Sequence, residues 1–174
     1  MSSTANLVYI TVGTGIGIGV VTNGKVVHGL VHPEGGHICI KKAEADKDFK
    51  GVCPFHGDCL EGLCSNIAIA TRKGLKIEDL SGLNDDDPVW ISVANYLAQA
   101  ILNLTLILSP ERVVIGGGIM NRKMLLPMIQ KEFVKLLNKY VQHPLLEEPE
   151  KYIVYPNYYP DNGIMAAILL GIEK

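Results

Sequence analysis

The sequence has little of what marks nucleic-acid-binding, membrane-spanning and secreted proteins. Its 174 residues carry a net charge of −2 with no arginine-rich run or basic stripe, which argues against a nucleic-acid partner. Residues 1–6 contain no basic segment of a secretory signal, and no apolar run approaches the roughly 20 residues of a membrane helix. Without such a signal, the four cysteines favour a reducing compartment over disulfide bonds, so we expect a cytoplasmic protein.

The remaining composition is that of an ordinary folded domain. Hydrophobic residues make up 48% of the chain and charged residues 20%, as in soluble globular proteins. A chain of this length suits one domain, or one large lobe with a small insertion, and it can bury a real core.

β-Branched runs that stop at glycines precede longer helical patterns. Residues 7–12, 16–21 and 26–27 predict three meandering strands. After a glycine-rich, irregular stretch at 29–58, the predicted elements are a helix from 60, a helix from 88 to 108 capped by Asp87, a strand at 112–115, a helix from about 121 to 141, a strand at 152–155 and a helix at 163–171. This order predicts an α/β fold of the ribonuclease-H-like (actin/hexokinase) type, in which helices cover a mixed sheet.

The most telling pattern is a set of histidines and cysteines at metal-ligand spacing. His37 is followed by Cys53, His56 and Cys59, the last three in a compact Cys-x2-His-x2-Cys segment. Zinc favours tetrahedral sulfur and nitrogen ligands, and four protein ligands leave no open position for water. The pattern therefore predicts a structural zinc in an insertion at about 29–60. The alternative is two free cysteines and two surface histidines.

The two other cysteines have weaker claims on the metal. Cys39 lies two residues after His37 and would share its face on a strand, so it could compete as a ligand, although we favour a buried thiol. Cys64 falls on the following helix, where packing is the better interpretation.

Two glycine-rich turns are candidates for nucleotide binding. The turn at 13–15 joins two strands, so it is not the dinucleotide fingerprint, yet its backbone N–H groups and the Thr14 hydroxyl could hold a phosphate. The glycines at 116–118 follow a buried strand, at the carboxyl edge where open α/β sheets bind ligands, and would let a flat ring lie against the backbone. The alternatives are an ordinary hairpin turn and a plain loop.

Taken together, these segments resemble the ROK family of sugar kinases, and in particular its bacterial-type fructokinases. The resemblance runs from residue 7 to residue 171. The segments that carry it, in family order, are 10–17, 33–37, 53–62, 114–118 and 161–164. Most of the family has a cysteine-richer zinc loop, and the form Cys-Pro-x-His-Gly-Asp-Cys at 53–59 resembles the fructokinase branch.

The resemblance implies an ATP site and its cofactors. Gly13 and Thr14 would lie on the second phosphate loop, and Gly117 and Gly118 would flank the adenosine. Mg²⁺ would accompany ATP, Zn²⁺ would be structural, and the protein would be a homodimer.

The resemblance also implies a sugar site. Glu34 and His37 belong to a Glu-x-Gly-His motif, and Glu61 is the glutamate after the last zinc cysteine. Carboxylates accept hydrogen bonds from sugar hydroxyls, and an imidazole donates or accepts them. His37 would use one ring nitrogen for zinc and leave the other free for sugar.

The resemblance covers one lobe of such a kinase. Ahead of these segments, kinases of the family carry an Asp-x-Gly-Gly-Thr phosphate loop and an Asn-Asp pair whose aspartate is the general base, and this sequence has neither there. Asp58 and the aspartates at 85–87 do not replace that base. We therefore expect residues 1–174 to be a C-terminal lobe, inactive without an N-terminal lobe, of an enzyme that converts fructose to fructose 6-phosphate with ATP.

Two other functions stay open. A sugar-sensing transcriptional regulator of the same family would bind sugar without phosphorylating it, but it would carry a helix-turn-helix segment, and nothing in this sequence is so arranged. A zinc-stabilised structural or dimerisation module would have no small-molecule site. Convergence of Glu34, His37 and Glu61 on one cleft would argue against that module.

Overall fold

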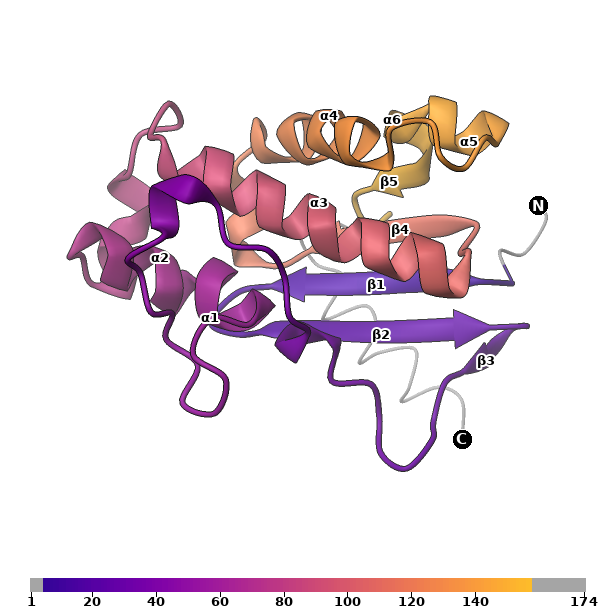
Figure 1. Ribbon diagram of the computed structural model, residues 1–174, viewed down its shortest axis with the longest axis horizontal. Helices are drawn as coiled ribbons and strands as arrows, with labels where there is room; N and C mark the ends of the chain where they lie inside the picture. Colours follow the sequence, from indigo (N-terminus) through magenta and orange to yellow (C-terminus); the bar gives the residue numbers. More distant parts are fainter. Residues whose placement is uncertain (1–4, 158–174) are drawn as a thin grey trace.

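The fold is built on a five-stranded mixed sheet. The computed structural model describes residues 5–157, so the predicted helix at 163–171 and the segment 161–164 lie outside the described residues. The strands are β1 (Leu7–Val12), β2 (Ile16–Thr22), β3 (Lys25–Val26), β4 (Arg112–Gly116) and β5 (Ile153–Val154). Their order is β3-β2-β1-β4-β5, with β1 to β3 antiparallel and with β4 and β5 parallel to β1 (Figure 1).

Alternating side chains give the sheet one apolar face. Ile10 on β1 pairs with Ile18 on β2 and with Ile115 on β4, and all three residues are at most 6% exposed. Burying a side chain of this size contributes about 1.5–3 kcal/mol. A slip of one residue would turn these side chains to the other face, so the apolar pattern fixes the register.

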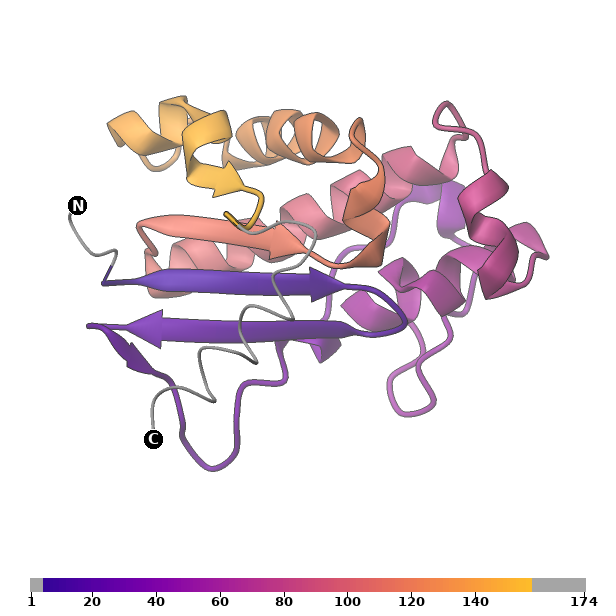
Figure 2. The ribbon, with the colours of Figure 1, turned by 180° about the vertical axis from the view of Figure 1, so that it is seen from behind.

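Helices cover this apolar face. The α-helices are α1 (Leu60–Cys64), α2 (Asn66–Lys73), α3 (Val89–Leu108), α4 (Leu125–Leu137), α5 (Pro144–Glu147) and α6 (Pro149–Tyr152). The 3₁₀ helices are η1 (Gly35–His37), η2 (Glu44–Asp46), η3 (Ile77–Gly82) and η4 (Gly118–Asn121). In Figure 1 the long helix α3 lies in front of the sheet with α4 beside it, and Figure 2 shows the sheet from its other side.

Most predicted elements are present with shifted boundaries: the helix predicted to residue 141 ends at Leu137, and the strand predicted at 152–155 is confined to Ile153–Val154 because α6 occupies the residues before it. The single helix predicted from residue 60 is two helices, because Ser65 has extended backbone and its hydroxyl accepts the N–H of Ala68 to begin α2. α3 begins one residue later than predicted, although the Asp87 carboxylate does accept the Val89 N–H, at 2.9 Å. α4 begins at Leu125 rather than near residue 121, because η4 occupies the preceding turn.

The expectation that no segment is long and apolar enough to cross a membrane was wrong for α3. Its 20 residues have a mean hydropathy of 1.6, so by length and composition alone α3 could cross a membrane. Half of this stretch is buried inside the protein, where α3 packs against α1 and α4. A helix in this position is the core helix of the domain.

The irregular stretch between β3 and α1 is attached to the core by buried polar groups. Asp46 of η2 is 4% exposed. It accepts the Tyr96 hydroxyl at 2.5 Å, and its other oxygen lies 3.1 Å from Nε of Arg72. The Ala43 N–H donates to the same tyrosine oxygen, and Arg72 also donates to the Leu63 carbonyl. This network joins η2 to both α2 and α3.

We expect Tyr96→Phe to destabilise the fold, because it leaves the buried Asp46 oxygen without a donor and the Ala43 N–H without an acceptor. The expected loss in the free energy of unfolding is about 1–3 kcal/mol, measured by urea denaturation. Tyr140→Phe is the matched control: Tyr140 is 83% exposed, and its change should stay within about 0.5 kcal/mol. Equal stability of the two variants would contradict a structural role for the network.

Candidate functional site

The four predicted metal ligands meet in one place. Ligand atoms of His37, Cys53, His56 and Cys59 all lie within 4.8 Å of one another. Nδ1 of His37 is 3.7 Å from Sγ of Cys53 and 3.6 Å from Sγ of Cys59, and Nδ1 of His56 is 3.6 Å from Sγ of Cys53. With Zn–S of about 2.3 Å and Zn–N of about 2.0 Å, tetrahedral coordination separates sulfur from nitrogen by about 3.5 Å. The donor set and its spacing therefore fit a zinc ion.

Short backbone links hold the ligands in this arrangement. Cys53 and Gly57 exchange two backbone hydrogen bonds, which close the loop that carries His56. Cys59 immediately precedes α1, and the Leu60 N–H donates to the Ile38 carbonyl, which brings the chain after His37 to the start of that helix.

His37 lies at the end of η1, which packs beside β2, and not on a strand itself as the interpretation of residues 37 and 39 assumed. Gly36 allows this placement. A Cβ at residue 36 would lie 2.0 Å from the Ile16 carbonyl oxygen, so only glycine lets η1 rest directly on the start of β2. The metal cluster is thereby fixed against the end of the β1–β2 hairpin.

The two cysteines of the cluster differ in acidity. Burial raises the pKa of the Cys53 thiol, but the backbone N–H groups of His56 and Phe55 and the neighbouring side chains outweigh it and bring the pKa to about 6. Burial, together with the neighbouring Cys53, raises the pKa of Cys59. Cys53 therefore gives up its proton more readily than Cys59, and both thiols must be deprotonated to bind a metal.

The other two cysteines stay outside the cluster. Cys64 is fully buried in the core, its Sγ lies 3.7 Å from the Val93 carbonyl, and burial raises its pKa to about 12, so the packing interpretation is confirmed. Cys39 is exposed and is not among the clustered ligands, so the favoured interpretation of a buried thiol was wrong. The alternation expected on a strand fails there because the chain around Cys39 is not a strand.

Of the three predicted sugar-binding residues, two converge. Oε1 of Glu61 lies 3.9 Å from Nε2 of His37, and both side chains are about a quarter exposed. Oε2 of Glu61 accepts the Ile16 N–H at 2.8 Å. Glu34 immediately precedes η1, and its backbone carbonyl accepts the His37 N–H. Its carboxylate is exposed and pairs with His32 at 2.8 Å.

The two glycine-rich turns lie side by side. β1 and β4 are parallel neighbours, so the turn at 13–15 and the loop at 116–118 leave the same edge of the sheet. Gly117 has a φ of +96°, and a Cβ there would lie 2.4 Å from the Val12 carbonyl oxygen, which explains the glycine. A Cβ at Gly13 or Gly118 would meet nothing within 4 Å, so the space in front of both residues is open.

A cavity of about 490 Å³ opens beside Gly118. Its walls come from η3, η4 and the start of α2, and it is large enough for a nucleoside. Asn66 lines it and donates its backbone N–H to the Gly13 carbonyl at 2.8 Å, which connects the cavity to the first turn. Arg122 lines it too, with its guanidinium 4.4 Å from the centre of the Trp90 ring.

Comparison with known proteins decides the family. The ROK family matches residues 1–173. The chain belongs to the ROK family. It is 44% identical to a fructokinase of Lactococcus lactis subsp. cremoris, over 91% of this chain and 52% of that protein, and 39% identical to a fructokinase of Pediococcus pentosaceus, over 95% and 55%. The chain thus spans about half the length of these curated relatives.

A solved structure confirms the predicted fold class. The ROK family glucokinase from Streptomyces griseus, determined with glucose and AMPPNP, superposes with a TM-score of 0.71 over 97% of this chain and 61% of that chain. The sequence identity is 20%, so the likeness concerns the fold, a hexokinase-type kinase fold. The resemblance identified in the sequence is confirmed by the family match.

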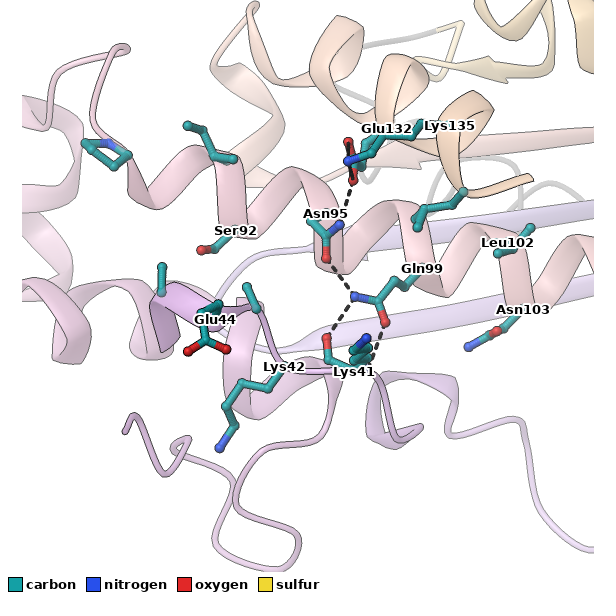
Figure 3. A pocket seen from close by; sticks show the side chains of 15 residues that line it. Lys41, Lys42, Glu44, Ser92, Asn95, Gln99, Leu102, Asn103, Glu132 and Lys135 are labelled. Carbon is teal, nitrogen blue, oxygen red and sulfur yellow. Dashed lines mark hydrogen bonds and ion pairs between the residues drawn. The ribbon is translucent and has the colours of Figure 1, made fainter. Parts of the chain in front are cut away.

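A second cavity of this ROK chain is not part of the candidate site. It measures about 760 Å³ and lies between α3, α4 and residues 41–45 (Figure 3). A row of hydrogen bonds runs along it from Glu132 through Asn95 and Gln99 to the backbone of Lys41. None of the predicted ligand, sugar or nucleotide residues lines it.

Sequence reasoning missed Asn66 and Arg122 as cavity residues. The serine cap at the start of α2 is a local signal that could have placed Asn66 at a helix N-terminus. Nothing in the sequence around Arg122 predicts its contact with Trp90, because Arg122 lies just after η4 and Trp90 on α3, and the two meet only through tertiary packing.

We expect the purified chain to bind one zinc ion per molecule, as measured by elemental analysis. Replacing any of His37, Cys53, His56 or Cys59 by alanine should lower the zinc content, and Cys53→Ala should increase proteolysis of residues 37–62 before the rest, because ligand binding energy is folding energy in such loops. Cys39→Ala is the control and should keep full zinc content. A zinc-free protein prepared without chelator would refute the site.

Proposed function

We propose that this chain is the sugar- and nucleotide-binding half of an ATP-dependent fructokinase that forms fructose 6-phosphate. Support comes from relatives called fructokinases, which are 37–44% identical along most of the chain. Because the chain spans about half of their length, the activity is proposed for the complete protein. The free cysteines support a cytoplasmic location for it.

The observation that carries this proposal is the position of Glu61 between the metal cluster and the first glycine turn. Its carboxylate faces the His37 ring across 3.9 Å, too far for a direct hydrogen bond. A sugar hydroxyl between them could donate to Oε1 of Glu61 and accept from Nε2 of His37. In the proposed site, Glu34 would add a third contact after turning away from His32.

The zinc would act on this sugar site through His37. Four protein ligands leave no open position, so the ion would be structural. A metal on Nδ1 leaves the proton on Nε2, and the ring would therefore present a donor toward Glu61. The cluster would orient the sugar-binding imidazole without taking part in the phosphate transfer.

The nucleotide would lie along the edge formed by the two glycine-rich turns. The phosphates would contact Gly13 and Thr14, and the adenosine would rest on Gly117 and Gly118 beside the 490 Å³ cavity. Mg²⁺ would neutralise charge on the phosphates during transfer. This order directs the terminal phosphate toward the sugar site next to Glu61.

The general base is assigned to none of the aspartates Asp58, Asp85 and Asp87. Asp58 pairs with Lys42, Asp87 with Lys73, and Asp85 with Arg122. The Lys42 ammonium holds the pKa of Asp58 below its usual range, as Lys73 does for Asp87. The resemblance assigns the base to the part of the relatives that this chain does not span.

We expect no phosphorylation of fructose by the 174-residue chain alone, and ATP-dependent phosphorylation after it is fused to the N-terminal half of the Lactococcus fructokinase. A coupled assay with fructose, glucose and mannose would measure both, with the highest kcat/KM for fructose. In the fusion, Glu61→Ala should raise KM for fructose by roughly 10-fold or more, because a charged hydrogen bond is lost, and should change KM for ATP less.

The control for this assay is Glu147→Ala, an exposed residue on α5, which should leave both KM values unchanged. Robust turnover by the isolated chain would refute the assignment of the base. Sugar binding by the fusion without phosphorylation would favour the regulator, and absence of both would favour a structural module.

We also propose that the protein is a homodimer, associating through the helical side of the sheet. Exposed apolar residues there include Ile91 (66%) and Ile107 (78%) on α3 and Val134 (43%) on α4. Light scattering should give twice the mass of one chain, and Ile107→Lys should shift it toward the monomer. Leu30→Lys, in an exposed loop, is the control and should stay dimeric. A monomer at every concentration would contradict the proposal.

A further inference from the structure

We propose that Glu61 is a positioning residue that makes the order of the β1–β2 turn depend on the metal cluster. The inference rests on the function proposed above only for the nucleotide-binding role of that turn. The physical link is one carboxylate with two attachments, one to the backbone of the turn and one toward a metal ligand. Figure 1 shows α1, which carries Glu61, beside the end of the β1–β2 hairpin.

The attachment to the turn is a hydrogen bond to its last backbone N–H. Ile16 is the first residue of β2, and its N–H donates to Oε2 of Glu61 at 2.8 Å. The same oxygen would lie 2.7 Å from a Cβ at Gly15, closer than real Cβ contacts come. Gly15 is therefore needed to admit the carboxylate. The space it leaves is filled by Glu61 and not by the main chain.

The attachment to the cluster passes through the His37 ring. Nδ1 of this ring faces both cysteine sulfurs, at 3.7 and 3.6 Å, while Nε2 faces Oε1 of Glu61 at 3.9 Å. Histidines that bind a metal commonly direct their second N–H toward a carboxylate, and at 3.9 Å this contact is an electrostatic attraction and not a direct hydrogen bond. Both side chains are about three-quarters buried, so water screens this attraction only in part.

The path of the backbone is a second reason why the order of the β1–β2 turn depends on the metal cluster. Glu61 comes two residues after the ligand Cys59, at the start of α1, so the same loop that would close on a metal also places the carboxylate. At the other end of the turn, the Gly13 carbonyl accepts the Asn66 N–H at 2.8 Å. Residues 61 and 66 thus hold the turn from both sides, and both belong to the segment that follows the cluster.

If Glu61 only met sugar, the order of the turn would not depend on metal or on the carboxylate. Hydrogen exchange of the Ile16 amide separates the two possibilities, because it reports the hydrogen bond itself and needs neither sugar nor nucleotide. We expect removal of zinc by a chelator to speed exchange at Ile16 roughly 10-fold or more in the unmodified chain, as the carboxylate loses its fixed partner.

Four variants make the test sharp. Glu61→Ala should bind one zinc and exchange quickly at Ile16 with or without the metal. Gly15→Ala should give the same result with Glu61 intact, because the new Cβ displaces the carboxylate. The double variant should be no faster than either single one. Gly19→Ala, where a Cβ meets nothing within 4 Å, should behave like the unmodified chain.

Glu61→Gln adds a rescue that a merely structural role would not predict. Its side-chain carbonyl can still accept the Ile16 N–H, so protection in the zinc-loaded protein should return to within about threefold of the unmodified chain. Slow exchange at Ile16 in zinc-loaded Glu61→Ala, or no response of the unmodified chain to zinc removal, would overturn the proposal. The exchange measurement uses no substrate, so it can contradict the role of Glu61 while the kinase assay supports the proposed function. The opposite outcome is equally distinguishable.

Discussion

The edge that carries both glycine-rich turns depends on the parallel pairing of β1 with β4. This pairing places Thr11 opposite Gly116, so the turn that follows β1 and the loop that follows β4 leave the sheet at one edge. Neither turn is a site by itself, because each presents only a few backbone groups. Side by side, and with the start of α2 attached to Gly13, they form a continuous polar edge beside a cavity.

The segment between β3 and α1 is held in one conformation mainly by side-chain contacts, because it has little regular secondary structure. It contains no strand and only two short 3₁₀ helices. One group of contacts is the His/Cys cluster, and another is the buried Asp46, which joins Tyr96 and Arg72. Such a segment can be precise without long regular elements, provided that each of its few buried polar groups is satisfied.

The sequence predicted the parts of the molecule that depend on local patterns. β-Branched runs that stop at glycines located β1, β2 and β4 to within a residue, and ligand spacing predicted that His37, Cys53, His56 and Cys59 come together. The family resemblance selected Glu61 but not its bond to Ile16.

What the sequence could not predict depends on contacts between distant segments. Helical periodicity continues through Ser65, so it gave no sign that α1 stops there. Cys39 is exposed because of the path that the loop takes. The Glu34 carboxylate pairs with His32 because both side chains are exposed and can rotate at the surface. Gly15 was interpreted as a turn residue, whereas its lack of a side chain serves a carboxylate 46 positions later in the chain.

The separation of these contacts along the chain has a consequence for how the protein folds. The ligands of the cluster lie within 22 residues, whereas β1 must find β4 on the order of a hundred residues away. Closing the short loop costs less entropy than closing the long one. The cluster can therefore assemble while β4 is still being synthesised. Metal capture would then come before the edge that carries both glycine-rich turns exists, and it would prepare the surface on which that edge is completed.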